Sequence, residues 1–255
     1  MIANYHTHTM RCRHARGTER EYIENALARG LKINGFSDHS PYLFEGDYVS
    51  SFRMLPDQAR DYVDTLLALR EEYKGKIEIP IGFEMEYYPK FFDKTIRWME
   101  QFHLDYLILA QHMLGSEIGE PGSHQATEDE NLLRRYVDLI VCGMSTGLFS
   151  CLAHPDLMKF KGSEGIYRKY MERLCQKALD FHVPLEYNLL GQHEKRQYPN
   201  PLFWQIAAEA GNEVILGCDA HDPERVAAED ELQEAKQFLD SLGIVPMETL
   251  PLRKC

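Results

Sequence analysis

Short apolar segments of β type alternate along the chain with longer stretches in which apolar residues recur three and four positions apart. Segments of the first kind are typical of buried strands, and those of the second kind are typical of amphipathic helices. Strands are expected at residues 2–6, 33–37, 77–83, 106–110, 149–153, 184–187 and 213–217. Helices are expected near residues 22–27, 133–144, 166–178 and 228–242. Pro56, Pro201 and Pro223 stand where helices would begin.

These βα repeats follow one another without a Ser/Gly linker, a low-complexity tract or a change in composition. The pattern therefore predicts a single domain spanning residues 1–255, with a parallel sheet covered by helices. A βα barrel and a doubly wound open sheet both fit this order of elements. Periodicity does not separate the two.

Composition narrows the class of protein. The chain has 255 residues, of which 44% are hydrophobic and 27% charged, as in an ordinary globular enzyme. No apolar run approaches the ~18 residues that span a bilayer, and no basic and apolar leader opens the chain, so neither a membrane partner nor export is expected. Six scattered cysteines without a C-x-x-C pair predict reduced thiols in a cytoplasmic protein. The formal charge of −12 argues against a nucleic-acid partner.

Residue types that bind metal ions stand at the ends of almost all the expected strands. In a parallel barrel these ends converge on one face, where active sites lie. The His-x-His pair of His6 and His8 puts two imidazoles on one side of an extended segment, with Cα atoms about 6–7 Å apart. The full set of candidate ligands is His6, His8, His14, His39, Glu84, His112, His154, Asp219 and His221.

A single histidine at a strand end is more often a capping or hydrogen-bonded residue than a ligand. Seven of the eleven histidines follow the strand-end pattern, however, and this favours a metal centre. Nitrogen donors mixed with carboxylates suit Zn, Fe or Mn better than Mg or Ca. Glu86 shares a strand face with Glu84 and is either a support for the site, a substrate contact or a solvated residue. We interpret three further histidines (His103, His124 and His182) as surface or packing residues. Two cysteines near the candidate ligands (Cys12 and Cys218) are interpreted as small core residues.

Five motifs surround the candidate ligands: His6-Thr7-His8-Thr9, Gly35-Phe36-Ser37-Asp38-His39-Ser40-Pro41, Gly82-Phe83-Glu84, Ala153-His154-Pro155-Asp156 and Gly217-Cys218-Asp219-Ala220-His221-Asp222-Pro223. They resemble the motifs of the PHP (polymerase and histidinol phosphatase) superfamily. Within that superfamily, the chain looks most similar to the monofunctional histidinol-phosphate phosphatases. The resemblance runs from about Ile2 to Leu242, nearly the whole chain.

This resemblance implies a distorted (β/α)7 barrel, a TIM-like fold, that holds three divalent ions of Zn, Fe or Mn. By position, the ligands would be His6, His8, Glu84 and Asp219 for the first ion, Glu84 as a bridge with His112 and His154 for the second, and His14, His39 and His221 for the third. The implied reaction is hydrolysis of L-histidinol phosphate to L-histidinol and phosphate, a step of histidine biosynthesis, by a metal-activated hydroxide. Glu84 and Asp219 then belong to the catalytic group, and Asp38 is a candidate acid for the leaving alkoxide.

One motif departs from the family pattern. The family continues as Asn-x-x-Gly-Leu-Arg after the sixth strand, with the arginine on the substrate phosphate, whereas Gln192-His193 follows Gly191 here. We expect a loop over residues 191–199 in which Arg196 takes over this contact, helped by His193. Two lysines that follow His154 are further candidates for binding the substrate: Lys159 and Lys161.

Three alternatives stay open at this point. The substrate of a phosphatase of this kind can be another small phosphomonoester. A metal-dependent amidohydrolase also begins with His-x-His, but it usually has a modified lysine on a middle strand, and His14, His39 and His221 have no role in that scheme. A nucleic-acid-processing PHP module is disfavoured by the acidic charge balance.

Overall fold

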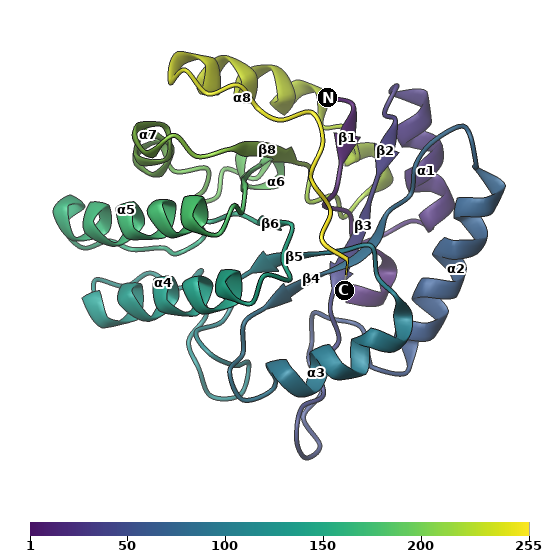
Figure 1. Cartoon of the computed structure of the whole chain (residues 1–255), viewed down its shortest axis with the longest axis horizontal. Coiled ribbons are helices and arrows are strands. Elements are labelled where there is room, and N and C mark those ends of the chain that lie inside the picture. The colour runs from purple at the N-terminus through teal and green to yellow at the C-terminus, as the bar shows by residue number, and fades with distance from the viewer. Residues whose placement is uncertain (255) are drawn as a thin grey trace.

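The sheet of the protein is parallel and curled, and the helices lie outside it (Figure 1). The computed structural model describes residues 1–254, so Cys255 lies outside the described residues. Six strands are hydrogen-bonded in sequence order: β3 (Phe36–His39), β4 (Ile81–Glu86), β5 (Tyr106–Ala110), β6 (Cys151–Leu152), β7 (Leu185–Asn188) and β8 (Val214–Gly217). Two further strands, β1 (Ala3–Asn4) and β2 (Ile33–Asn34), pair with each other in parallel.

Backbone hydrogen bonds join the segment after β1 to both edges of the six-stranded sheet. On one side, the carbonyl of Thr7 accepts from the N–H of Ser37 at 2.9 Å. On the other side, the N–H of His8 donates to the carbonyl of Ala220, also at 2.9 Å. The sheet therefore closes into a distorted barrel, because the first segment fills the space between β3 and the end of β8. The strand order also excludes a doubly wound sheet, in which the order reverses at a switch point. The predicted TIM-like barrel is confirmed.

The helices are α1 (Glu19–Ala28), α2 (Gln58–Glu72), α3 (Phe92–Met99), α4 (Glu130–Ser145), α5 (Glu164–Asp180), α6 (Leu189–His193), α7 (Pro201–Ala210) and α8 (Glu229–Ser241), with 3-10 turns at η1 (Met10–Cys12), η2 (Glu100–Phe102) and η3 (Pro223–Arg225). Neighbours α4, α5 and α7 pack side by side on one flank of the sheet (Figure 1). The core fills the space between sheet and helices and includes Trp204, Tyr62 and Phe83. No helix of the described residues is long and apolar enough to cross a membrane.

Most of the expected elements are present, with local differences. The four helices expected from apolar spacing are α1, α4, α5 and α8, and Pro201 is the first residue of α7. Pro56 precedes α2, which begins at Gln58, whereas Pro223 opens only the 3-10 turn η3. The expected strand at 77–83 lies further on, at β4, because Pro80 has no N–H for the ladder. Helix α3 was not among the expected helices, and its eight residues span little more than two turns.

The expected strand at 33–37 is divided into β2 and β3 by Gly35. The N–H of this glycine donates to the carbonyl of Asn4 at 2.7 Å, so the backbones of the two segments approach closely here. A Cβ at position 35 would lie 2.6 Å from the hydroxyl oxygen of Tyr106. Only glycine fits at this crossing, and the chain changes partner there from β1 to β4.

Candidate metal centre

Imidazoles surround the carboxylate of Glu84, which is only 1% exposed. One oxygen, Oε1, lies 2.9 Å from Nε2 of His154, 3.5 Å from Nε2 of His6 and 3.6 Å from Nε2 of His112. The other oxygen, Oε2, lies 2.8 Å from Nδ1 of His39. Strand pairing explains the last contact, because His39 and Glu84 are directly opposite each other in the register of β3 and β4. Nε2 of His8 lies 3.7 Å from the same Oε2 atom, so one buried carboxylate brings together five of the candidate histidine ligands.

Asp219, just beyond β8, gathers a second group around its Oδ1 atom. This oxygen lies 3.0 Å from Nε2 of His8, 3.4 Å from Nε2 of His6 and 3.4 Å from Nδ1 of His221. A third group consists of His14, His39 and His221, whose ligand atoms all lie within 4.8 Å of one another. All nine candidate ligands therefore meet at one end of the barrel.

Three of these histidines form a hydrogen bond from Nδ1, the ring nitrogen that faces away from the cluster, to a carboxylate. Nδ1 of His6 lies 2.7 Å from Oε2 of Glu186, and Nδ1 of His112 lies 2.7 Å from Oε1 of Glu86. Nδ1 of His8 lies 3.3 Å from Oδ1 of Asp38. Each carboxylate accepts from an Nδ1–H, so the Nε2 lone pair is directed towards the cluster. This arrangement recurs at metal sites, where it fixes the tautomer and raises the basicity of the ligand.

Glu186 owes its place behind His6 to a glycine. A Cβ at Gly217 would lie 2.2 Å from Oε2 of Glu186, so the neighbouring strand β8 must lack a side chain at this point. The side-chain amide of Asn188 donates to Oε1 of Glu186 at 2.8 Å and to Oδ2 of Asp219 at 3.1 Å. Asn188 therefore links Glu186, which lies behind the cluster, to Asp219, which is part of it.

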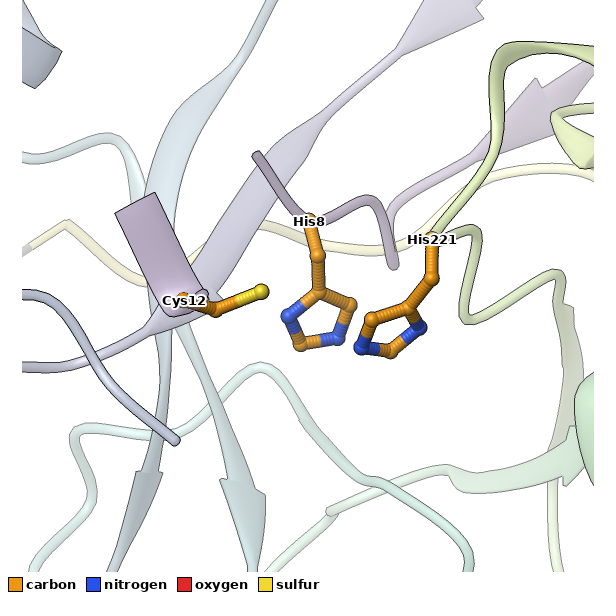
Figure 2. A group of neighbouring side chains, drawn as sticks. All are labelled: His8, Cys12 and His221. Carbon is orange, nitrogen blue, oxygen red and sulfur yellow. The ribbon is translucent and has the colours of Figure 1, made fainter. Parts of the chain in front are cut away.

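Cys12 lies beside the third group, with Sγ directed towards the ring of His8, which stacks on that of His221 with centroids 4.0 Å apart (Figure 2). Burial, together with the charge of Asp38, raises the pKa of the Cys12 thiol and so disfavours a thiolate ligand. Cys12 is fully buried, as expected for a small core residue, and so is Cys218 at 2% exposure.

The electrostatics of the cluster are those of a site built for cations. Burial would lower the pKa of His6, but Glu186, Asp219 and Glu84 outweigh it and raise the pKa well above its usual value. Burial would raise the pKa of Glu84, but His112, His39 and His6 hold that pKa well below its usual range. Burial and the nearby His8 lower the pKa of His221 to about 3, which keeps its lone pair free.

Several ligand atoms of the cluster make no well-aligned hydrogen bond within residues 1–254, although carboxylate oxygens or imidazole nitrogens lie close to them. They are Nε2 of His6, His8 and His221 and Oε2 of Glu84, all buried. A buried polar atom without a partner costs about 1–3 kcal/mol, so such atoms are rarely left this way. Bare imidazole nitrogens that face carboxylate oxygens are the donor set of Zn, Fe or Mn. The residues therefore fit a site for divalent transition-metal ions.

Two of the candidate ligands have a strained backbone conformation. His154 has φ = 28° and Asp219 has φ = 48°, a left-handed region that costs a non-glycine residue on the order of 1–3 kcal/mol. Strain of this kind persists where function requires a particular side-chain direction.

A cavity of about 380 Å³ opens onto the cluster, a volume suited to a small molecule. Five candidate ligands form part of its wall: His14, His39, His112, Asp219 and His221. The remaining wall is formed by Phe52, Met113, His124, Leu157, Leu190, Glu194, Arg196 and Tyr198. His124, which we interpreted as a surface or packing residue, is exposed as expected but also lines this cavity.

Of the residues expected to bind substrate, Arg196 lines the cavity and His193, Lys159 and Lys161 do not. The segment after β7 begins as the helix α6 and not as a loop, because the side chain of Asn188 accepts from the N–H of Gly191 and caps it. The helix directs His193 towards α8, where its Nδ1 lies 2.7 Å from Oε1 of Glu231.

Asp38 is fully buried and does not line the cavity. Its Oδ1 accepts from the N–H of His39 at 2.8 Å, and its Oδ2 accepts from the hydroxyl and the N–H of Thr9. This environment suits a carboxylate that orients His8. It does not suit an acid that approaches a leaving group.

A comparison with known protein families matches the PHP domain to residues 4–190. The chain belongs to the PHP family. It is 31% identical to a probable histidinol-phosphatase of Deinococcus radiodurans over 88% of each chain. It is 28% identical to a histidinol-phosphatase of Bacillus subtilis over 85% of this chain and 92% of the relative.

Solved structures with the same fold include a histidinol phosphate phosphatase of Lactococcus lactis, complexed with Zn, L-histidinol and phosphate. Its TM-score is 0.75 at 19% identity, covering 96% of this chain and 95% of the other. A putative histidinol phosphatase of Listeria monocytogenes has a TM-score of 0.74 at 18% identity, covering 88% and 97%. This likeness covers more of the chain than the PHP domain match, which ends at residue 190.

The role of Glu186 can be tested with Glu186→Gln, which keeps the shape of the side chain and removes its charge. We expect the affinity for zinc to fall roughly ten- to a hundredfold, as is usual when a carboxylate behind a metal-binding histidine is changed. Competition with a chromophoric chelator measures this affinity. Glu213→Gln, at an exposed position before β8, is the matched control and should leave it unchanged. Wild-type affinity in Glu186→Gln would contradict the role assigned to Glu186.

Proposed function

We propose that this protein hydrolyses L-histidinol phosphate to L-histidinol and phosphate in a metal-dependent reaction. The observation that carries this proposal is a cavity of small-molecule size whose wall includes five of the nine converging metal-ligand candidates. A substrate in this cavity lies against the ligands themselves. The similarity to histidinol-phosphatases along nearly the whole chain supports the choice of substrate. With this activity the protein takes part in histidine biosynthesis, and its reduced thiols suit the cytoplasm.

Three ions fit the donor set. We assign His6, His8, Glu84 and Asp219 to the first, Glu84, His112 and His154 to the second, and His14, His39 and His221 to the third. Four of the five close groups of ligand atoms are drawn entirely from these nine residues. When bound, the ions supply positive charge to the phosphoryl oxygens and lower the pKa of a coordinated water.

Arg196 is the residue that we assign to the phosphate. Its Nη1 donates to the hydroxyl of Tyr198 at 2.9 Å, and its Nε donates to Oε2 of Glu194 at 2.6 Å. These contacts hold the guanidinium at the cavity wall, where its planar fork suits two phosphoryl oxygens. Glu194 lines the same wall and offers a negative charge to the ammonium group of histidinol phosphate.

The segment that carries Arg196 is anchored to the loop that follows β6. The side-chain amide of Gln197 donates to the carbonyl of Leu157 at 2.7 Å. The carboxylate of Asp156 accepts from the N–H of Asn200 at 2.6 Å and from the indole N–H of Trp204 at 3.1 Å. These contacts fix the distance between Arg196 and the metal ligand His154, which lies two residues before Asp156.

A different small phosphomonoester is the main alternative substrate, because the cavity volume alone does not select among such molecules. Steady-state hydrolysis of L-histidinol phosphate, compared with a panel of sugar and nucleotide monophosphates, tests the proposal. We expect kcat/KM for L-histidinol phosphate to exceed the others at least tenfold, which corresponds to ~1.4 kcal/mol in the transition state. A sugar or nucleotide monophosphate preferred by the same margin would leave only the reaction class standing.

Arg196→Met should lower kcat/KM for L-histidinol phosphate by roughly one to two orders of magnitude, the loss expected for a charge-assisted contact of ~1.5–3 kcal/mol. The metal content should stay the same, because Arg196 contacts none of the ligands. Arg168→Met is a suitable control, since Arg168 is paired with Glu172 and Glu209 on the outside of α5. Unchanged kinetics in Arg196→Met would mean that Arg196 does not bind the phosphate.

A further inference from the structure

Arg53 is a fully buried arginine that lies between three loops at the metal-binding end of the barrel. Only 1% of it is exposed, although it belongs to the long segment between β3 and α2. Its guanidinium carbon lies 4.5 Å from the ring centroid of Phe52, a residue of the cavity wall. The metal ligands and the wall of the cavity thus share one buried cation as a neighbour.

The donors of Arg53 reach one partner at the end of β4, one between β5 and α4, and one in the segment after β3 to which Arg53 itself belongs. Nη2 donates to both oxygens of Glu86, at the end of β4, at 2.9 and 3.0 Å. Nε donates to Oε1 of Glu117, in the segment between β5 and α4, at 2.5 Å. Nη1 donates to the carbonyl of Ser40, the residue after His39, at 2.7 Å. A planar guanidinium satisfies all of these directions at once, and a lysine ammonium cannot.

Glu86 is the link from Arg53 to the metal centre. Its Oε1 atom, which Arg53 binds, also accepts from Nδ1 of His112 at 2.7 Å. Nε2 of the same ring then faces Glu84 at 3.6 Å. A buried carboxylate that loses its arginine is free to turn away, and His112 then loses the acceptor that fixes its tautomer.

We propose that Arg53 is a positioning residue for the metal centre, which acts through Glu86 to hold His112 with its Nε2 lone pair directed at the ions. Arg53 touches neither substrate nor ion. Its effect on metal binding therefore depends on Glu86. The inference rests on the proposed metal-dependent function. Its test compares the zinc affinity of variants with that of the wild type, so it applies once the wild type has been shown to bind zinc.

The experiment uses the full chain, with Arg53→Lys as the main variant because it keeps the positive charge between two buried carboxylates. Zinc affinity is measured by chelator competition for the wild type, Arg53→Lys, Glu86→Gln and the double variant. Arg135→Lys is the matched control, since Arg135 forms a bidentate pair with Glu120 near the same loop, at 2.8 and 2.7 Å, away from the ligands. Nitrogen-15 NMR of the metal-free protein reports the tautomer of His112.

We expect Arg53→Lys to weaken zinc binding roughly tenfold or more and to lower the population of the Nδ1–H tautomer of His112. In the Glu86→Gln background the same substitution should have little further effect, because its route to the metal is already broken. Arg135→Lys should behave as the wild type in both measurements. A purely structural role for Arg53 would lower stability and leave the tautomer unchanged.

The inference is overturned if Arg53→Lys keeps wild-type zinc affinity and tautomer, or if its effect is as large without the carboxylate of Glu86 as with it. Should Arg53→Lys fail to fold, Glu117→Gln replaces it: this change loosens Arg53 from its outer side and should cause a smaller loss of the same kind. Unchanged zinc affinity and tautomer in Glu117→Gln would then reject the inference. A wild-type protein that binds no zinc would reject the proposed function instead.

Discussion

The structure depends on one electrostatic constraint: the carboxylate of Glu84 is buried among imidazoles at the centre of the barrel mouth. An ionised carboxylate without compensation costs several kcal/mol in such a place. Protons on the histidines can supply part of the compensation, but burial and mutual repulsion work against it, as the lowered pKa of His221 illustrates. Divalent cations satisfy the carboxylates and leave the imidazoles neutral. Ions that neutralise the site would therefore also stabilise the folded barrel mouth.

The barrel solves this problem by parallel geometry and by a layer of supporting charges. Parallel strands bring their carboxyl ends to one face, so ligands from distant parts of the chain meet without long loops. Behind them, Glu186, Asp38 and Glu86 each accept a hydrogen bond from one imidazole, and Arg53 fixes the last of these carboxylates. The ligands are thus oriented from behind, and the cavity side is left open to the substrate.

The sequence predicts the ligands better than their supports. His6, Glu84 and Asp219 lie where apolar strand patterns end, and this is a local signal. Glu186 contacts a histidine 180 positions away, and neither residue indicates the other in the sequence. Arg53 looks like an ordinary charged residue of a polar loop, and its burial follows only from the way three loops fold together. A polar residue between the apolar Leu185 and Tyr187 of β7 was the one available hint of Glu186.

The shape of the substrate side was equally hard to predict. Closure of the barrel depends on backbone hydrogen bonds at Thr7 and Ala220, which carry no side-chain signature. The cavity wall combines apolar residues from several loops with His124, whose isolated position in the chain pointed to an ordinary surface residue. The place of Arg196 at the cavity wall was predictable, because a basic residue was missing from its usual position in the motif. The position of His193 was not predictable. The cap at Asn188 makes the segment a helix, and this helix places the imidazole against α8.

Nine converging side chains are expected to form a centre for more than one metal ion. Elemental analysis of the purified protein, stripped with a chelator and then reloaded with Zn, Fe or Mn, measures this directly. We expect more than one tightly bound ion per chain and up to about three, with phosphatase activity that appears in step with loading. Fewer than one ion per chain after loading, with activity insensitive to the chelator, would contradict it.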